Sequence, residues 1–128
     1  MPKWIVKKIL NEFRDKKPKI LILGIAYKKN VDDDRESPAF EIMKILMKKK
    51  IYFDFNDPYF SSIRRGRQIA FTKKAILINK KNLKFYDAVL VLTDHDKFDY
   101  KFIYNNSKKV FDCRGVYKRF NFKDIYYC

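Results

Sequence analysis

Glycine is scarce in this sequence, with three residues among 128. Loops that cradle phosphates need glycines at fixed spacing, because their backbone must approach the phosphate closely. The apolar run ending at Leu23-Gly24 continues as Ile25-Ala26-Tyr27, which is not the G-x-G-x-x-G spacing of dinucleotide-binding loops. A G-x-x-x-x-G-K-[ST] segment is also missing. The sequence therefore excludes both common glycine-rich nucleotide-binding motifs.

Cysteine and histidine are equally scarce, with Cys113, Cys128 and His95 as the complete set. Two cysteines form neither a disulfide framework nor a four-ligand metal site, so we expect two free thiols. Because the sequence places no base near Cys113, we expect a buried, unreactive thiol there rather than a nucleophile. His95 lies between two aspartates. That pattern is open to a metal or acid–base site but is more typical of a cap or surface turn.

Long apolar runs are missing too. No segment approaches the ~20 apolar residues that cross a bilayer, and the first residues lack the apolar stretch of a signal peptide. Apolar residues still make up 47% of the chain and aromatic residues 17%, which is enough for a core and argues against a disordered tail. A length of 128 residues fits one domain. We therefore expect a single folded domain in the cytoplasm, without membrane contact.

Acidic residues are half as frequent as basic ones, 15 against 30, which gives a net charge of +15. Such a charge favours an anionic partner, such as nucleic acid, anionic lipid or a phosphorylated small molecule. However, 23 of the basic residues are lysine and 7 are arginine, whereas base readout and bidentate phosphate binding favour arginine. The charge alone leaves open a specific anion site and a compositional bias towards lysine.

Apolar runs alternate with amphipathic segments along the chain, which predicts an α/β fold. Ser37-Pro38 is typical of a helix start, because serine caps free N–H groups and proline suits the first turn. We predict helices over 2–14, from 38 onward, near 59–65, near 79–84 and over 100–106, and strands over 19–24, 51–55, 68–72, 88–92, 109–112 and 125–127. This alternation favours a Rossmann-like open, mostly parallel sheet with helices on both faces, preceded by an N-terminal helix.

In such a sheet, ligands bind beyond the carboxyl ends of the strands. Four basic residues follow those ends, namely Lys28, Lys29, Arg35 and Arg114. If they converge, they form a positive pocket suited to a phosphate or diphosphate, and Tyr27 is placed to stack on a base or sugar. The alternative is that Arg35 pairs with the neighbouring aspartates and the lysines are solvated.

Four longer segments carry distinctive motifs: residues 19–38 (KILILGIAYKKNVDDDRESP), 52–59 (YFDFNDPY), 86–100 (YDAVLVLTDHDKFDY) and 110–117 (VFDCRGVY). In order and spacing they resemble the C-terminal domain of the UDP-glucose/GDP-mannose dehydrogenase family. The third segment is most similar to the branch acting on UDP-N-acetylglucosamine or UDP-N-acetylmannosamine. The resemblance implies that residues 1–17 are a remnant of the central dimerisation helix and that 18–128 form the UDP-sugar-binding, Rossmann-like domain.

The resemblance also assigns roles to individual residues. It implies that Tyr27 and Lys28 contact the UDP-sugar, with Lys28 at its phosphates. It further implies that Arg35 lies near the active centre and that Arg114 contacts the nucleotide. The segment around Arg114 departs from the family pattern, because Cys113 stands where threonine is usual. These four substrate-binding residues are our site prediction, with no catalytic residue and no metal.

The complete family enzyme is an NAD-dependent UDP-sugar 6-dehydrogenase, whose NAD domain and catalytic cysteine lie upstream of the resembling region. We therefore expect a substrate-binding domain that has no cofactor of its own and no dehydrogenase activity alone. Its expected partners are a UDP-sugar and either the N-terminal dehydrogenase part or a second copy, bound through residues 2–14. The alternative is a small basic Rossmann-like module that binds nucleic acid or another polyanion, which a steep salt dependence of binding would reveal.

Overall fold

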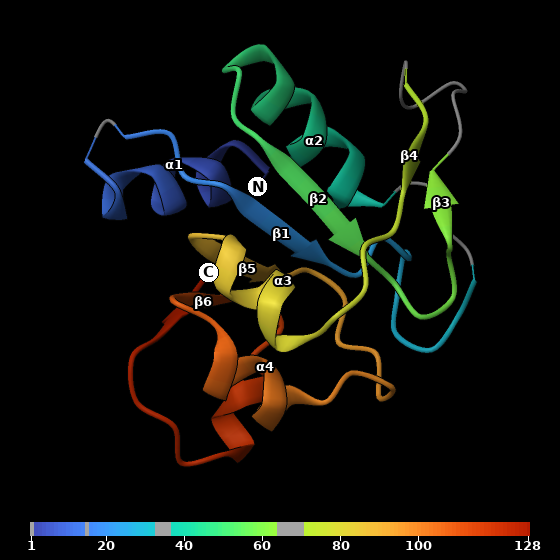
Figure 1. Cartoon of the computed structure of the whole chain (residues 1–128), viewed down its shortest axis with the longest axis vertical. Coiled ribbons are helices and arrows are strands. Elements are labelled where there is room, and N and C mark those ends of the chain that lie inside the picture. Colours follow the sequence, from blue (N-terminus) through green and yellow to red (C-terminus); the bar gives the residue numbers. More distant parts are fainter. Residues whose placement is uncertain (1, 15, 33–36, 64–70) are drawn as a thin grey trace.

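A five-stranded parallel sheet forms the centre of the molecule, in the order β2-β1-β5-β6-β7 (Figure 1). The computed structural model describes residues 2–14, 16–32, 37–63 and 71–128. The strands are β1 (Ile20–Leu23), β2 (Phe53–Asn56), β5 (Ala88–Val91), β6 (Val110–Asp112) and β7 (Ile125–Tyr127). Every residue of β1 and β5 is buried, as their continuous apolar runs predict. The predicted Rossmann-like parallel sheet is confirmed.

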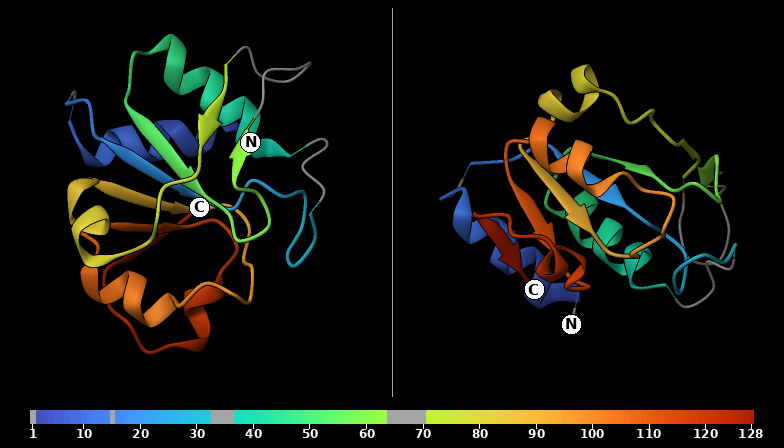
Figure 2. Two further views of the ribbon diagram at one scale, coloured as in Figure 1. Left: turned by 45° about the vertical axis from the view of Figure 1, so that its right-hand side comes forward. Right: turned by 90° about the horizontal axis from the view of Figure 1, so that it is seen from below.

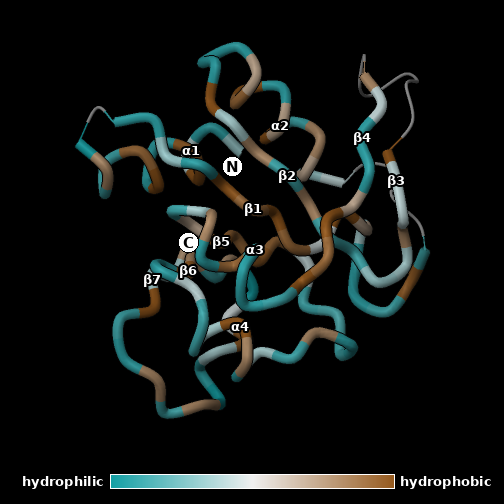
Figure 3. Tube along the Cα trace, in the orientation of Figure 1, coloured by the Kyte–Doolittle hydropathy of each residue, from teal (hydrophilic) through white to brown (hydrophobic). Residues whose placement is uncertain are grey.

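Helices cover both faces of this sheet (Figure 2). Helices α1 (Pro2–Glu12) and α2 (Pro38–Lys48) lie on one face, and α3 (Lys80–Phe85), α4 (Tyr100–Asn106) and the 3-10 helix η1 (Val116–Arg119) lie on the other. Successive strand residues point to opposite faces. Ile20 and Ile22 therefore enter the core under α1 and α2, while Leu21 and Leu23 enter the second core. The hydrophobic colour of β1 in Figure 3 marks this doubly buried centre.

Polar side chains start the helices where the sequence predicts them. The Ser37 hydroxyl accepts the Ala39 N–H at 3.2 Å, and proline occupies the first turn of α2. Asp99 caps α4 by accepting the Phe102 N–H at 3.1 Å, and Asn79 caps α3. Each cap satisfies a donor that has no partner within its helix.

Helix α1 packs against α2 and shares its core. Ile5, Val6 and Ile9 are buried, and Ile9 has no exposed surface. The apolar side of the predicted helix is thus covered within this chain. In the described part of the chain, no helix has the length and apolar character needed to cross a membrane.

The segment after β2 differs from the prediction of a helix near 59–65. Residues 64 and 65 lie outside the described residues, and Ser62–Ile63 instead form β3, which pairs antiparallel with β4 (Lys73–Lys74). The chain folds back where the Phe60 N–H donates to the Asp57 carbonyl at 3.2 Å, and the segment is then joined to the end of β4, where the Ala75 N–H donates to the Ser61 carbonyl at 2.9 Å. Pairing with a later segment thus overrides the local helix pattern, as tertiary contacts commonly do.

The strand predicted over 68–72 differs from the structure at residues 71 and 72, the part of it that the structure describes. Residues 68–70 lie outside the described residues, and 71–72 precede β4 rather than forming a strand.

Candidate functional site

The strand order reverses between β1 and β5. From β1 the chain moves outward to β2 and then returns to β5 on the other side of β1 (Figure 1). In open parallel sheets, ligands commonly bind beyond the carboxyl ends of the strands at such a reversal. Three predicted site residues follow the carboxyl ends of strands in this sheet. Tyr27 and Lys28 follow β1, and Arg114 follows β6.

Gly24 allows the loops after β1 and β5 to touch. Its φ is +92°, and an added Cβ would lie 2.5 Å from the Cβ of Thr93 and 2.7 Å from its backbone nitrogen. Only glycine fits both that backbone conformation and that distance. The Thr93 hydroxyl also donates to the Ala26 carbonyl at 2.8 Å, so the two loops are joined directly after the strands end.

Asp57, which follows β2, organises the loop after β1. Its Oδ2 atom accepts the N–H groups of Ile25 at 2.8 Å and Ala26 at 3.2 Å, and lies 2.9 Å from His95 Nε2. Burial raises the pKa of this carboxyl, but hydrogen bonds from His95 and from the Tyr59 and Ile25 N–H groups outweigh burial and lower the pKa. Asp57 is therefore held as a buried carboxylate that positions backbone.

His95 continues this network to the far end of the same loop. Its Nδ1 accepts the Asn30 N–H at 2.8 Å, so Nε2 carries the proton that it donates to Asp57. The Asn30 side chain in turn donates to Asp96 at 2.7 Å and accepts the Asp96 N–H at 2.9 Å. We call Asp57, His95 and Asn30 the loop anchor, because they attach the loop of residues 24–32 to the ends of β2 and β5.

The prediction of a cap or surface turn at His95 is wrong, since the side chain has no exposed surface. Its ring packs beside Tyr59, with 4.9 Å between ring centroids, and beside Phe98, at 5.7 Å. The Tyr59 contact comes from a segment far away in the sequence, and together the two rings help to keep water from the imidazole. Among the described residues there is also no cluster of three or more histidine, cysteine or acidic side chains suited to a metal ion.

Arg114 reaches from the end of β6 to the loops after β5 and β1. Its Nε donates to the Leu92 carbonyl at 2.7 Å, and its Nη2 donates to the Tyr27 carbonyl at 3.5 Å. Buried Asp112 orients this turn by accepting the N–H groups of Arg114 at 2.9 Å and Gly115 at 2.8 Å. The structure thus brings Arg114 and Tyr27 together at the point where the strand order reverses.

The other predicted basic residues have different surroundings. Lys28 is exposed in the anchored loop, next to Tyr27, whose side chain is 48% exposed. The Lys29 ammonium lies 4.0 Å from Asp96, an exposed pair of small energetic value. Arg35 lies outside the described residues.

The loop anchor is the part of the site that the sequence analysis missed. Local sequence patterns assign no role to Asn30 or Asp57, and at His95 they favour a cap or surface turn. The available signal was positional, because Asp57 and His95 each follow a buried strand of a parallel sheet.

The turn after β1 does not fit a dinucleotide pyrophosphate. In a dinucleotide-binding loop, free backbone N–H groups at this turn face the pyrophosphate. Here the Ile25 and Ala26 N–H groups donate to the Asp57 carboxylate, so they are not available to a pyrophosphate. The structure therefore agrees with the missing glycine motif.

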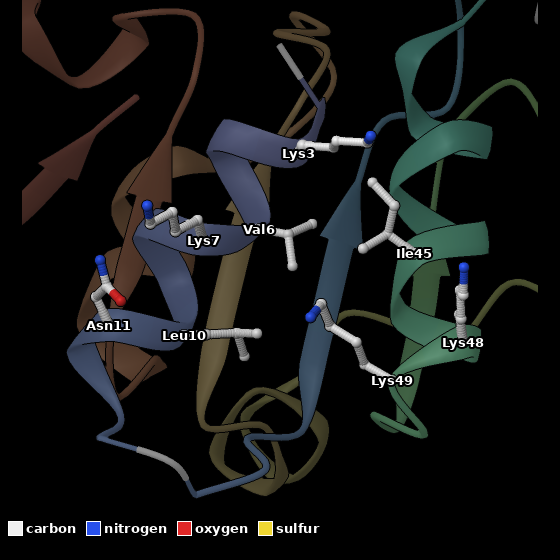
Figure 4. A pocket seen from close by; sticks show the side chains of 8 residues that line it. All are labelled: Lys3, Val6, Lys7, Leu10, Asn11, Ile45, Lys48 and Lys49. Atoms are coloured by element: carbon white, nitrogen blue, oxygen red, sulfur yellow. The ribbon is translucent and has the colours of Figure 1, made fainter.

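A groove of about 720 Å³ lies between α1 and the C-terminal half of α2 (Figure 4). Val6 and Ile45 face each other across it, and its rim carries lysines, namely Lys3, Lys7, Lys48 and Lys49. Because the C-terminal end of α2 leads into the start of β2, the groove lies towards the amino ends of the strands. Among the described residues that line it, none is Tyr27, Lys28 or Arg114.

Comparison with known proteins assigns the chain to a family. Residues 21–119 match the UDP-glucose/GDP-mannose dehydrogenase family, UDP binding domain. A UDP-N-acetyl-D-mannosamine dehydrogenase of Methanococcus aeolicus is 33% identical over 101 residues, covering 77% of this chain and 21% of that protein. UDP-glucose 6-dehydrogenase 4 of Arabidopsis thaliana is 29% identical over 138 residues, covering 88% of this chain and 28% of that protein.

Solved structures agree with this assignment. The UDP-N-acetyl-mannosamine dehydrogenase Cap5O from S. aureus superposes with a TM-score of 0.68 at 27% identity, over 98% of this chain and 29% of that one. The chain spans less than a third of the length of each of these relatives. It belongs to the UDP-glucose/GDP-mannose dehydrogenase family, corresponds to that family's UDP binding domain, and is close to the UDP-N-acetylmannosamine dehydrogenase branch.

Proposed function

We propose that this chain binds the UDP part of a UDP-sugar at the carboxyl edge of the sheet, between β1 and β5. The observation that carries the proposal is the position of Arg114, whose guanidinium lies 2.7 Å from the Leu92 carbonyl and 3.5 Å from the Tyr27 carbonyl. A guanidinium has five N–H donors, so this placement leaves donors for phosphate oxygens. The location is also where ligands bind in open parallel sheets.

Neighbouring residues supply the other contacts of the proposed site. Lys28 contributes positive charge to the diphosphate, and the exposed ring of Tyr27 stacks on the uracil or the ribose. The loop anchor holds both residues in place before the ligand arrives, which reduces the ordering cost of binding. Arg35 is the fourth residue that we propose for this site, on the basis of the family resemblance alone.

The proposed place of this chain in the reaction is substrate binding. Its relatives are named as dehydrogenases of UDP-N-acetyl-D-mannosamine and of UDP-glucose. We propose a UDP-N-acetylhexosamine as the substrate, which the complete enzyme would oxidise to the uronic acid with NAD. Because the turn after β1 does not fit the pyrophosphate of NAD, the hydride acceptor would be held by a part of the enzyme outside these 128 residues.

Isothermal titration calorimetry with UDP tests the proposed site directly. We expect saturable binding that Lys28→Ala weakens by about tenfold, equivalent to about 1.4 kcal/mol. The matched control is Lys81→Ala, which removes the same charge from an exposed position on α3 and should leave affinity unchanged. Absence of UDP binding at millimolar concentration, or equal losses in both variants, would contradict the proposal.

The net charge of +15 supports one competing function, the binding of nucleic acid or another polyanion. The salt dependence of binding distinguishes UDP binding from polyanion binding. For a polyanion, the logarithm of the affinity falls linearly with the logarithm of the salt concentration, with a slope set by the number of phosphates contacted. We expect UDP affinity to depend weakly on salt and to exceed the affinity for a single-stranded oligonucleotide at physiological salt. The opposite ranking would favour the polyanion function.

Self-association through residues 2–14 is a second proposed contact, and α1 limits its strength. Ile5, Val6 and Ile9 are already buried in this chain, which leaves Trp4 (51% exposed) as the large exposed hydrophobic residue of α1. A stable interface needs a larger apolar core than one side chain supplies. We therefore propose at most weak self-association. Sedimentation velocity across a range of concentrations measures it, with Trp4→Ala as the variant that should abolish any dimer.

A further inference from the structure

The two cysteines of the chain stand opposite each other at the ends of β6 and β7. These parallel strands pair Asp112 with Tyr127, so the next residues, Cys113 and Cys128, are the following pair. The Cys128 N–H donates to the Asp112 carbonyl at 3.1 Å, which continues the strand pairing to Cys128. Neighbouring strands lie about 4.8 Å apart, within the ~4.4–6.8 Å range of Cα separations that disulfides span.

Both cysteine side chains lie on the same face of the sheet. Two residues earlier, the rings of Phe111 and Tyr126 stack with 4.9 Å between centroids. Side chains two positions apart on a strand share a face, and Cys113 and Cys128 accordingly pack against the same core as those rings. Both cysteines are only partly buried, so Cys113 is not the enclosed thiol that the sequence predicted, and small reagents have access to the pair.

The surroundings shift the pKa values of the two thiols in opposite directions. A hydrogen bond from Cys113 and the charge of Lys8 lower the pKa of Cys128, although burial opposes them. The same hydrogen bond and burial raise the pKa of Cys113. The thiolate is the reactive form of cysteine, so we expect Cys128, which is near the positive charge of Lys8, to attack first and Cys113 to attack second.

We propose that Cys113 and Cys128 form a redox modification site that reacts with a low-molecular-weight disulfide and closes a reversible bond between β6 and β7. The Cys128 thiolate attacks one sulfur of the small disulfide, whose S–S bond breaks and releases one thiolate. Cys113 then loses its proton and attacks the Cys128 sulfur, which releases the second small thiol. Two protein thiols are oxidised to one disulfide, and one small disulfide is reduced to two thiols.

Oxidised glutathione is the probe for this reaction. The reduced chain is incubated with it, and the products are followed by intact mass, by mapping of cross-linked peptides and by non-reducing electrophoresis. We expect a monomer that has lost two hydrogen atoms, a cross-link between the peptides of Cys113 and Cys128, and full reversal by dithiothreitol. A stable glutathione adduct without the cross-link, a disulfide-linked dimer, or an unreacted chain would overturn the proposal.

Serine variants test the order of the two steps. Cys113→Ser should stop at a glutathione adduct on Cys128, because the second thiol is missing. Cys128→Ser should react at Cys113 at least about tenfold more slowly, because the less acidic thiol provides less thiolate. Equal rates in the two variants would contradict the assigned order. Circular dichroism checks that both variants are folded, and the wild-type experiment is independent of them.

Discussion

His95 donates a hydrogen bond to Asp57 across 2.9 Å, and both side chains are completely buried. The same carboxylate accepts three backbone N–H groups, those of Ile25, Ala26 and Tyr59. One buried side chain therefore holds the segments after β1, β2 and β5 in a fixed arrangement. The loop that carries Tyr27 and Lys28 depends on it.

Asp57→Asn should destabilise the fold strongly. An amide accepts fewer hydrogen bonds than a carboxylate, and its NH₂ group would face donors that then lose their partner. We expect a loss of about 2–3 kcal/mol in the free energy of unfolding, measured by urea denaturation. The control is Asp96→Asn, an exposed change on the neighbouring loop, for which the loss should stay below about 1 kcal/mol. Similar losses in both variants would contradict the role of the loop anchor.

Stability should also fall in acid because of Asp57. Its pKa is lower in the folded chain than the value of about 3.9 for an ordinary aspartate. The stabilisation of the fold by the ionised Asp57 carboxylate is therefore complete at pH values above the ordinary aspartate pKa. It is lost as the pH falls through the lower pKa of Asp57 in the folded chain. Urea titrations from neutral pH down to about pH 3 should show this loss. In Asp57→Asn, the free energy of unfolding should decline less as the pH falls. The same decline as in the wild type would exclude Asp57 as its source.

Gly24→Ala should be far more damaging than Gly115→Ala. Both glycines have positive φ, +92° and +74°, so both substitutions strain the backbone. At Gly24 the new Cβ would also lie 2.5 Å from the Thr93 Cβ, whereas at Gly115 its nearest neighbour is the flexible Lys118 side chain at 3.5 Å. We expect about 1–2 kcal/mol for Gly115→Ala and a loss of more than about 3 kcal/mol for Gly24→Ala. Thermal and urea unfolding of the two variants provide the comparison.

Arg114→Lys should weaken UDP binding even though it keeps the charge. A lysine ammonium replaces the planar donor set that spans the Leu92 and Tyr27 carbonyls with a single point charge. We expect at least about a tenfold loss of UDP affinity, or about 1.4 kcal/mol, by calorimetry. Arg119→Lys is the matched control on η1, where the guanidinium lies over Phe120. Unchanged affinity in Arg114→Lys would remove Arg114 from the proposed site.

The purified 128-residue chain should show no dehydrogenase turnover. In the turn after β1, the Ile25 and Ala26 N–H groups donate to Asp57. Because they are occupied, this turn does not fit the pyrophosphate of NAD. NADH formation from UDP-N-acetylmannosamine and NAD is followed by absorbance, with UDP calorimetry on the same sample to show that the chain is active in binding. Turnover in that sample would refute the proposed division of roles.

Much of the secondary structure followed from local patterns. The buried runs at 20–23 and 88–91 and the helix over 100–106 agree with the prediction to within one or two residues. Their signals are local, because an apolar run or a capping side chain stabilises the nearby backbone in any context. The family motifs predicted roles for Tyr27, Lys28, Arg35 and Arg114, all within the matched residues 21–119, and these roles stay predictions.

What the tertiary structure decided concerns contacts between distant segments. Arg114 meets the Tyr27 carbonyl across 87 positions, His95 meets Asp57 across 38, and Cys113 meets Cys128 through the register of β6 and β7. Local pattern carries no information on such pairs, since they depend on strand order and register. The sequence by itself determined the strands of the parallel sheet, the helix starts and the absence of a glycine-rich dinucleotide motif, but not the pairing of β3 with β4. Only folding determined that His95 is buried and that the two cysteines are neighbours, because burial and pairing are set by the packing of the whole sheet.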